Sequence, residues 1–281
     1  SRIAMFEQAL DTRSTHEHMR EQSTRVSFGK EWMNESILDI YREDIARFKV
    51  LLSSQSEEES WDMIQKGQVP ELHSLLVHNS TVYRWNRPQY GISGNGKPHL
   101  RIENRVLPAG PTVPDQMANA VFWLGMMKGM ASQVGDIRNL IEFSDLRDNF
   151  GRAARFGIQA DFTWLKGKRI QASELIKKEL LPLAEIGLKE CKISSSDIDK
   201  YLGIIKDRNK KKTNGAIWIL DSYSNLIKNS IGKDEALSVI THSIMKNQKT
   251  NTPVHKWKKA DFNDLVDYQP LELKVSEFML T

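Results

Sequence analysis

The segment HLRIENR, residues 99–105, concentrates side chains that could bind anions or a metal ion. Side chains two positions apart on a β-strand lie on the same face. If this segment is a strand, Arg101, Glu103 and Arg105 therefore point the same way. Arginine guanidinium groups bind phosphate and carboxylate groups through paired hydrogen bonds, and a carboxylate beside them can hold Mg²⁺ together with substrate phosphates. In a functional interpretation, the row lines a cleft for a phosphorylated or carboxylated substrate and a metal ion.

A structural interpretation of the same row remains open. On a solvated face of an antiparallel sheet, Glu103 would balance the arginines by pairing with them across strands. The preceding segment favours the cleft, because Arg87 in the sequence WNRP lies just before a predicted turn and could face the same side. Three arginines around one glutamate are an unusual use of charge for a purely structural hairpin.

Two predicted strands position these residues. The segment from Leu75 to Trp85 alternates and is rich in β-branched and aromatic residues, which predicts a strand that also carries Asn79. The segment from His99 to Leu107 alternates in the same way. Between them, Gly91 to Pro98 holds three glycines, one asparagine and one proline, which predicts a turn. We therefore expect an antiparallel hairpin.

The rest of the chain is predicted to be mostly helical. Apolar spacing predicts helices over residues 2–10, 32–52, 57–66 and about 115–131, and a helical pattern from Asp136 onward with breaks near Gly167, Ser194, Gly215, Gly232 and Thr250. Small residues on one side of the helix at 115–131 indicate close approach to another backbone: Ala118, Gly125 and Gly129. The expected fold is α+β, with a mixed part over residues 1–166 and a helical C-terminal region over 167–281.

Composition narrows the classes of partner. The 281 residues include 40 Lys and Arg against 36 Asp and Glu, a formal net charge of only +4. The one segment dense in basic residues, Lys206 to Lys212, is interpreted as solvent-exposed, so we expect no nucleic-acid partner. The longest apolar stretch, Ala120 to Met127, is far shorter than the ~20 residues of a membrane span. A single cysteine, Cys191, cannot form an internal disulfide, which favours a reducing, cytoplasmic location.

The order and spacing of several motifs resemble a known family. WNRP, HLRIENRVLPAGPT and DQMANAVFWLGMMKGM together resemble the carboxylate–amine ligase branch of the glutamate–cysteine ligases, within the glutamine synthetase-like superfamily. The close resemblance covers about Leu75 to Met130. Two further segments are similar to the family with less specificity, HEHMRE at residues 16–21 and NFGRAARFGI at residues 149–158.

The resemblance implies an ATP- and Mg²⁺-dependent ligase of the kind that serves glutathione biosynthesis. A substrate carboxylate, typically the γ-carboxylate of glutamate, takes the γ-phosphoryl group of ATP, and an amine such as that of cysteine attacks the acyl phosphate to form an amide. By position, Glu103 would bind Mg²⁺ and Arg101 the ATP phosphates. Arg105 and Arg87 would act on the substrate carboxylate or the transferring phosphoryl group. Asn79 is a further candidate for contact with the bound nucleotide.

One departure from the family pattern limits this expectation. The other metal-binding carboxylates of the superfamily come from an acidic strand in the N-terminal half, and no Glu-x-Glu strand precedes Leu75 here. Residues 1–166 would then be the C-terminal half of a glutamine synthetase-like catalytic domain, with little or no ligase activity alone. Such a half would associate with the missing N-terminal half or form a homo-oligomer. Two alternatives are a non-catalytic ligand-binding or regulatory protein of the same fold, and a helical interaction module.

Overall fold

The computed structural model describes residues 2–10, 24–53 and 59–265 of the chain. Within these residues the fold is α+β, as expected, and consists of helices with three small two-stranded sheets. The described residues form two compact units. The first comprises those up to 108 together with 137–170, and the second comprises 109–136 together with those from 171 onward. The segment 109–136 thus groups with the C-terminal unit, although it precedes part of the first unit in the chain.

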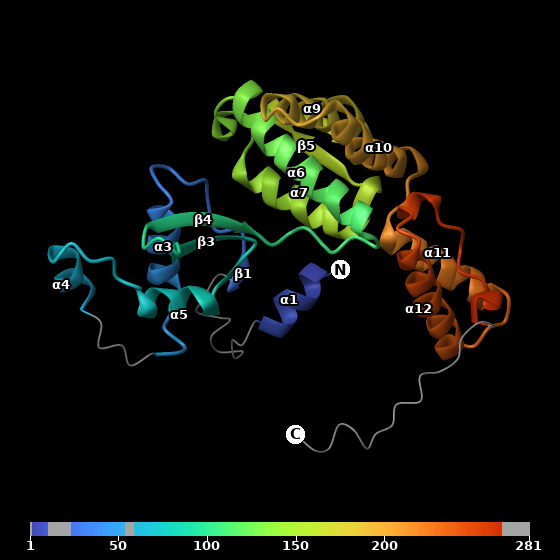
Figure 1. Ribbon diagram of the computed structural model, residues 1–281, viewed down its shortest axis with the longest axis horizontal. Coiled ribbons are helices and arrows are strands. Elements are labelled where there is room, and N and C mark those ends of the chain that lie inside the picture. The colour runs from blue at the N-terminus through green and yellow to red at the C-terminus, as the bar shows by residue number, and fades with distance from the viewer. Residues whose placement is uncertain (1, 11–23, 54–58, 266–281) are drawn as a thin grey trace, which may run out of the picture. The chain divides into compact units, whose positions relative to one another are not determined.

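The first unit contains short helices and all three sheets (Figure 1). Its elements are α1 (Arg2–Leu10), β1 (Val26–Ser27), α3 (Leu38–Arg47), α4 (Ser60–Gln65), α5 (His73–Thr81), β2 (Tyr83–Arg84), β3 (Asn86–Ile92), β4 (Pro98–Asn104), η1 (Ile137–Asn139), α7 (Phe143–Phe156), η2 (Gly157–Gln159), β5 (Asp161–Trp164), η3 (Leu165–Gly167) and β6 (Lys168–Gln171). Strands β1 and β2 pair in parallel, whereas β3 and β4 form an antiparallel hairpin.

The second unit is helical. Its elements are α6 (Val113–Gln133), α8 (Ala172–Leu175), the π-helical turn η4 (Ile176–Leu180), α9 (Leu181–Glu190), α10 (Ser195–Lys211), α11 (Gly215–Lys228), α12 (Lys233–Lys249), η5 (Val254–Lys256) and η6 (Phe262–Leu265). Helices α6, α9 and α10 pack together (Figure 1). Among the described residues, no helix is both long and apolar enough to cross a membrane.

Helix α6 begins where the sequence predicts. The Thr112 hydroxyl accepts a hydrogen bond from the backbone N–H of Asp115 at 3.3 Å, and Pro114 lies in the first turn. Both features are favourable at a helix start, because the first N–H groups have no partner within the helix. The predicted close approach is confirmed. A Cβ atom built on Gly125 would lie 2.6 Å from the carbonyl oxygen of Ala184 in α9, so only glycine permits this contact.

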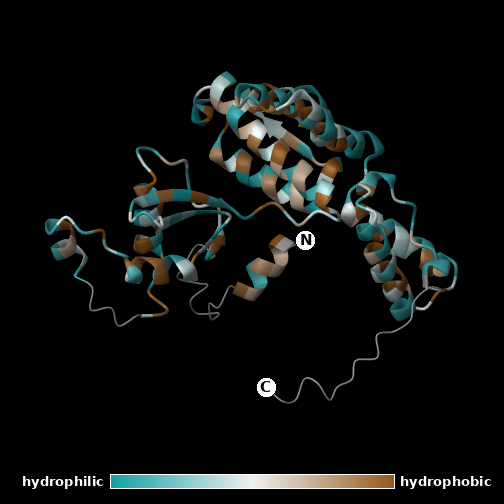
Figure 2. Ribbon diagram, in the orientation of Figure 1, coloured by the Kyte–Doolittle hydropathy of each residue, from teal (hydrophilic) through white to brown (hydrophobic). Residues whose placement is uncertain are grey.

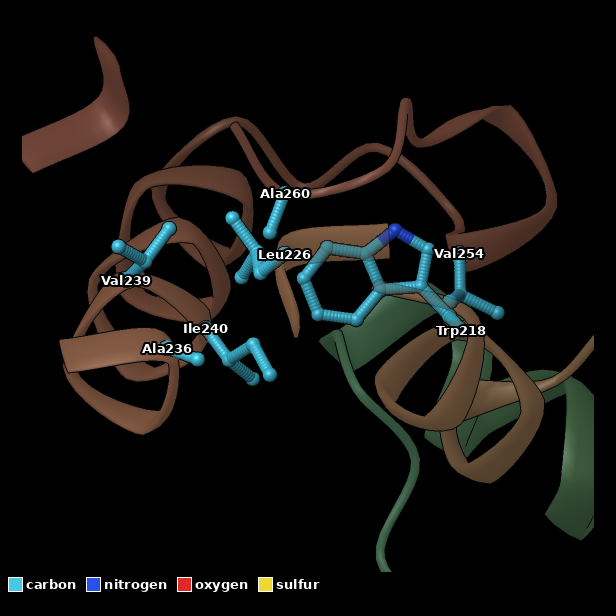
Figure 3. Close-up of a cluster of buried hydrophobic side chains, with 7 residues drawn as sticks. All are labelled: Trp218, Leu226, Ala236, Val239, Ile240, Val254 and Ala260. Atoms are coloured by element: carbon cyan, nitrogen blue, oxygen red, sulfur yellow. The ribbon is translucent and has the colours of Figure 1, made fainter. Parts of the chain in front are cut away.

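One apolar cluster of the second unit lies between α11, α12 and the segment that follows them, and further clusters lie among α6, α9 and α10. Figure 3 shows the indole of Trp218 extending across this cluster toward Leu226. Seven buried side chains form it: Trp218, Leu226, Ala236, Val239, Ile240, Val254 and Ala260. The Trp218 indole N–H donates to the carbonyl oxygen of Lys258 at 2.7 Å. The chain after α12 is therefore folded back onto the helices.

The hairpin exists, but its first strand was predicted in the wrong place. Of the strand predicted at residues 75–85, residues 75–81 lie on helix α5 and residues 83–84 form β2, and the partner of β4 is β3 at residues 86–92. Buried hydrogen bonds stabilise α5 against its local strand propensity, since Nε2 of His78 lies 2.9 Å from the Phe48 carbonyl oxygen. Pro88 and Gly91 make β3 hard to predict from the sequence, because both residues are rare inside strands.

Other helix predictions hold in part. The helices predicted at 2–10 and 115–131 are confirmed as α1 and α6, whereas the one predicted at 32–52 is shorter, as α3. The prediction of helix throughout from Asp136 was wrong at β5 and β6. The helix predicted at 57–66 is found as α4, with residues 57 and 58 outside the described part. The family-like segment at 149–158 lies on α7 and η2, and HEHMRE lies outside the described residues.

Candidate functional site

Four of the predicted site residues lie on or directly beside the β3–β4 hairpin. In the observed register Arg87 is opposite Glu103 and Gln89 is opposite Arg101. The backbone N–H of Arg105 donates to the Trp85 carbonyl oxygen at 2.9 Å, which continues the pairing by one step beyond β4. Figure 2 shows that β4 carries both apolar and polar residues. The alternation predicted for residues 99–105 is therefore present, with Arg101, Glu103 and Arg105 at alternate positions.

Glu103 is held between two arginines. Its Oε2 atom accepts hydrogen bonds from Nε of Arg87 at 3.0 Å, and lies 2.9 Å from Nη2 of the same residue. Nε of Arg105 lies 3.1 Å from the same oxygen. Burial by itself would raise the pKa of Glu103, but the charge and hydrogen bond of Arg105 and the charge of Arg87 outweigh it, so the pKa lies below its ordinary value. The carboxylate is ionised at neutral pH.

The Arg105 guanidinium packs over the ring of Tyr83. The guanidinium carbon Cζ lies 4.4 Å from the ring centre, within the range of a cation–π contact. The Tyr83 ring in turn packs against Trp85 at 5.4 Å between ring centres and against Phe6 at 4.7 Å. These ring contacts restrict the motion of the Arg105 guanidinium. Arg105 is therefore held as a cation beside Glu103.

The Arg87–Glu103–Arg105 cluster carries a formal charge of +1 and is partly open to solvent. The side chains of Arg87 and Arg105 are 17% and 14% exposed, and that of Glu103 is 42% exposed. Guanidinium groups held in this way can turn N–H groups toward a phosphate or carboxylate. The cross-strand pairing expected from the structural interpretation is also present. The structure thus contains the cross-strand contacts that the structural interpretation predicted, and the functional interpretation stays a prediction.

Arg101 and Asn79 lie apart from this cluster. Nη1 of Arg101 is 3.1 Å from Nε2 of His99, at the end of β4 nearer the turn. Asn79 is buried on α5, where its side-chain amide donates to the carbonyl oxygen of Pro88 at 2.8 Å. That bond attaches the hairpin to α5. The structure therefore places the Asn79 amide in a packing contact, on a helix rather than on the strand predicted for it.

Sequence reasoning assigned no role to Arg84, the most extensively bonded arginine near the hairpin. Its Nε donates to both oxygens of the buried Asp44 carboxylate, at 2.8 and 3.0 Å. Its Nη2 donates to Glu43 at 2.8 Å and its Nη1 to the Phe28 carbonyl oxygen at 3.0 Å. Burial raises the pKa of Asp44 against the opposing charge of Arg84. The only sequence signal was an arginine among apolar residues at 82–85.

The described residues provide one carboxylate near the arginines and no protein cage for a metal. Among them, no group of three or more His, Cys, Asp and Glu side chains is placed to hold a metal ion. The Arg87 and Arg105 contacts with Glu103 all involve Oε2. Mg²⁺ keeps several waters and is commonly bound through one or two carboxylates plus substrate phosphates. Glu103 therefore offers a single carboxylate, and a Mg²⁺ ion bound there would need substrate phosphates and waters as its other ligands.

The family-like residues of α6 have structural roles in the second unit. Asp115 is fully buried, accepts from the Thr112 hydroxyl at 2.8 Å and from the backbone N–H of Val254 at 3.0 Å, and lies 3.2 Å from Nη2 of Arg208. Arg208 also donates to the side chain of Asn119 at 2.8 Å. These bonds connect the start of α6 with α10 and with η5.

Comparisons with protein-family models, with curated proteins and with solved structures give no match to this chain. The geometry of the hairpin and the motif resemblance are therefore the observations on which a function can be proposed.

Proposed function

We propose that this chain supplies part of the active site of an ATP-dependent carboxylate–amine ligase similar to the glutamate–cysteine ligases. The Arg87–Glu103–Arg105 cluster is the observation that carries the proposal. It places two guanidinium groups and an ionised carboxylate on one side of a hairpin, in a segment whose motifs resemble that family. In this proposal the β3–β4 hairpin belongs to a glutamine synthetase-like catalytic sheet.

The chemistry assigns a task to each group. The γ-carboxylate of glutamate attacks the γ-phosphorus of ATP, ADP leaves, and an amine such as that of cysteine then displaces phosphate from the acyl phosphate. Such phosphoryl transfer depends on positioning and on stabilisation of negative charge. Arg105 and Arg87 bind the substrate carboxylate or the transferring group, and Arg101 contacts ATP phosphates near the turn. Bound Mg²⁺ would neutralise phosphate charge, with Glu103 as its ligand.

The remaining acidic groups would come from a second polypeptide segment. Glutamate, ATP and an amine are the small-molecule partners, and association with an N-terminal half or with a second copy would complete the site. A non-catalytic ligand-binding protein is the second candidate. It is favoured by the cross-strand pairing of Glu103 with Arg87, which satisfies the carboxylate without any substrate.

Calorimetric titration with ATP tests the proposal, because binding does not require a complete active site. We expect Arg87→Gln and Arg105→Gln each to weaken ATP binding by about tenfold or more, since a hydrogen bond to a charged group contributes roughly 1.5–3 kcal/mol. The control is Arg152→Gln, on α7 and outside the cluster, which should bind ATP as the wild type does. Absence of ATP binding to the wild-type chain would overturn the nucleotide role of this hairpin.

A second titration separates the two candidate functions through Glu103. Glu103→Gln removes the ion pairs of Arg87 and Arg105 under either candidate, so ATP binding in EDTA should strengthen in both cases. If Glu103 binds Mg²⁺, the substitution also removes the gain in ATP affinity that Mg²⁺ gives the wild type, whereas if Glu103 only balances the arginines, that gain is kept. The ligase proposal requires the first result.

A further inference from the structure

The first unit contains a cavity of about 970 Å³ that the hairpin cluster does not use. It lies between α1, the segment 24–30 and α7, and Trp85 also lines it. Neither Arg87, Glu103 nor Arg105 is among its lining residues. Small-molecule sites are typically clefts of about 300–1,000 Å³ lined by apolar groups with a few placed polar ones. The volume is therefore sufficient for a ligand of the size of an aromatic metabolite.

One wall of the cavity is aromatic and well packed. The rings of Phe28 and Phe150 meet nearly perpendicularly, with 4.5 Å between their centres. Phe150 also contacts the buried Trp85 at 5.5 Å. Val26, likewise buried, lies on the same wall. Because these rings are fixed by one another, the wall offers an apolar surface that suits a flat ring system.

The charges around the cavity are predominantly positive. Four basic residues line it, Lys30, Arg47, Arg147 and Arg155, against one acidic residue, Glu7. Arg47 forms an ion pair with Glu43, four residues earlier on α3. Lys30 and Arg147 are exposed, and neither has an ion-pair partner within the described residues. Arg155 is also exposed and without an ion pair among the described residues, but its guanidinium lies over the Phe156 ring, 5.2 Å from the ring centre. Lys30 and Arg147 therefore border the aromatic wall as cations with neither a charge partner nor a ring partner among the described residues.

A buried network holds the Lys30 side of the cavity in place. Gly29 has a φ of +108°, a backbone conformation that residues with a side chain rarely adopt, and a Cβ atom there would collide with Arg84. Arg84 bonds the Phe28 carbonyl oxygen and both Asp44 oxygens. The segment that carries Phe28 and Lys30 is therefore anchored to the interior. A pre-formed wall lowers the cost of ordering a site upon binding.

We propose that this cavity is a binding site for a planar aromatic anion, with the ring on Phe28, Phe150 and Trp85 and the negative group toward Lys30 and Arg147. The ligand class follows from an aromatic wall that lies next to unbalanced cations. A purely apolar ligand would leave the two cations unused, and a small inorganic anion would leave the aromatic wall exposed to water. The site is separate from the hairpin and does not rest on the proposed ligase function.

Two matched fluorescent probes test the charge requirement. The first, 8-anilinonaphthalene-1-sulfonate, is an anion with a flat naphthalene ring system, and the second, N-phenyl-1-naphthylamine, is its uncharged counterpart. The full chain is expected to bind one equivalent of the anion. The double variant Lys30→Gln/Arg147→Gln should weaken binding of the anion at least tenfold and change binding of the neutral probe less than threefold. Equal affinity of the variant and the wild type for the anion would overturn the proposal.

Variants of α7 test the position of the site. Ala154 lines the cavity and its neighbour Ala153 does not, so Ala154→Phe should abolish binding of both probes and Ala153→Phe should leave it intact. Arg152→Gln is the charge control and Arg105→Gln the hairpin control, and both should bind the anion as the wild type does. A comparable loss in either control would overturn the assignment to this cavity. If Ala154→Phe fails to fold, the charge variants decide, because Lys30 and Arg147 are exposed.

Discussion

Arg87 and Glu103 lie directly opposite each other on the β3–β4 hairpin, and their side chains meet at the carboxylate oxygen that Arg105 also contacts. The pairing places one negative charge between two positive ones at a partly exposed position. The carboxylate is therefore ionised, and the cluster keeps a net positive charge. Both properties are measurable without knowledge of the substrate.

The hairpin cluster should contribute a small, pH-dependent stability. The pKa of Glu103 is lowered in the folded chain, so its contribution is present above the ordinary glutamate pKa and is lost as pH falls through the folded value. The side chain is partly exposed, so solvent screening limits the effect to less than about 1 kcal/mol. Urea unfolding of Glu103→Gln should show this loss at pH 7, and the difference from the wild type should shrink progressively as pH falls below 4.5. A difference that persists in acid would contradict the ionised pairing.

Removal of Arg84 should destabilise the first unit far more. Arg84→Met leaves the Asp44 carboxylate buried without its partner, and breaking a buried pair from one side costs about 3–5 kcal/mol. Arg84→Met/Asp44→Leu removes both charges and should recover much of the loss. Urea titrations followed by tryptophan fluorescence measure both variants. A loss below about 1 kcal/mol in the single variant would show that the pair is not buried as described.

The contact between α6 and α9 depends on glycine. A Cβ atom at Gly129 would collide with the carbonyl oxygen of Leu183, so Gly129→Ala forces the helices apart and should cost about 1–3 kcal/mol or more. Gly203 on α10 has nothing within 4 Å of the corresponding position. Gly203→Ala should therefore stabilise the chain by about 0.5–1 kcal/mol, the usual gain in a helix interior. Thermal unfolding of the two variants should shift in opposite directions.

Stability of the second unit should fall in mild acid because of His255. Burial lowers the pKa of the His255 imidazole below its ordinary 6.5, and the Asp207 carboxylate, 3.5 Å from Nε2, opposes this only in part. The unfolded chain then takes up a proton that the folded chain does not, so stability is greatest above about pH 6.5 and declines as pH falls. His255→Leu should flatten the decline between pH 7 and pH 5. An unchanged pH profile would contradict the role of this histidine.

The substitution His255→Leu should also remove a destabilising contribution from the second unit. Neither ring nitrogen of His255 has a hydrogen-bond partner within the described residues. A buried polar group without a partner is destabilising, so His255→Leu should not lower the melting temperature at pH 8. Differential scanning calorimetry at pH 8 and pH 5 measures both effects on the same samples.

Local patterns in the sequence were sufficient for several elements. The alternation at residues 99–105 predicted β4, and Thr112, Pro114 and Asp115 have the chemistry of a helix start. The small residues of α6 predicted its close packing against a neighbouring backbone. These features depend on residues a few positions apart, and their interactions are nearly the same in any fold.

Tertiary contacts determined the remainder. Residues 73–81 have strand-like composition, yet they form a helix because His78 and Asn79 find buried partners at Phe48 and Pro88. Arg84 and Asp44 are 40 positions apart, and nothing near either residue in the sequence marks their pairing.

The sequence by itself determined which side chains share a face of β4, since the period of a strand is a property of the backbone. Only the tertiary structure decided that Glu103 meets Arg87, that Asn79 lies inside, and that an aromatic wall lies beside Lys30 and Arg147. Pairing register and burial depend on contacts between distant segments. The net free energy of such a contact depends on the hydration that each group loses when it is buried.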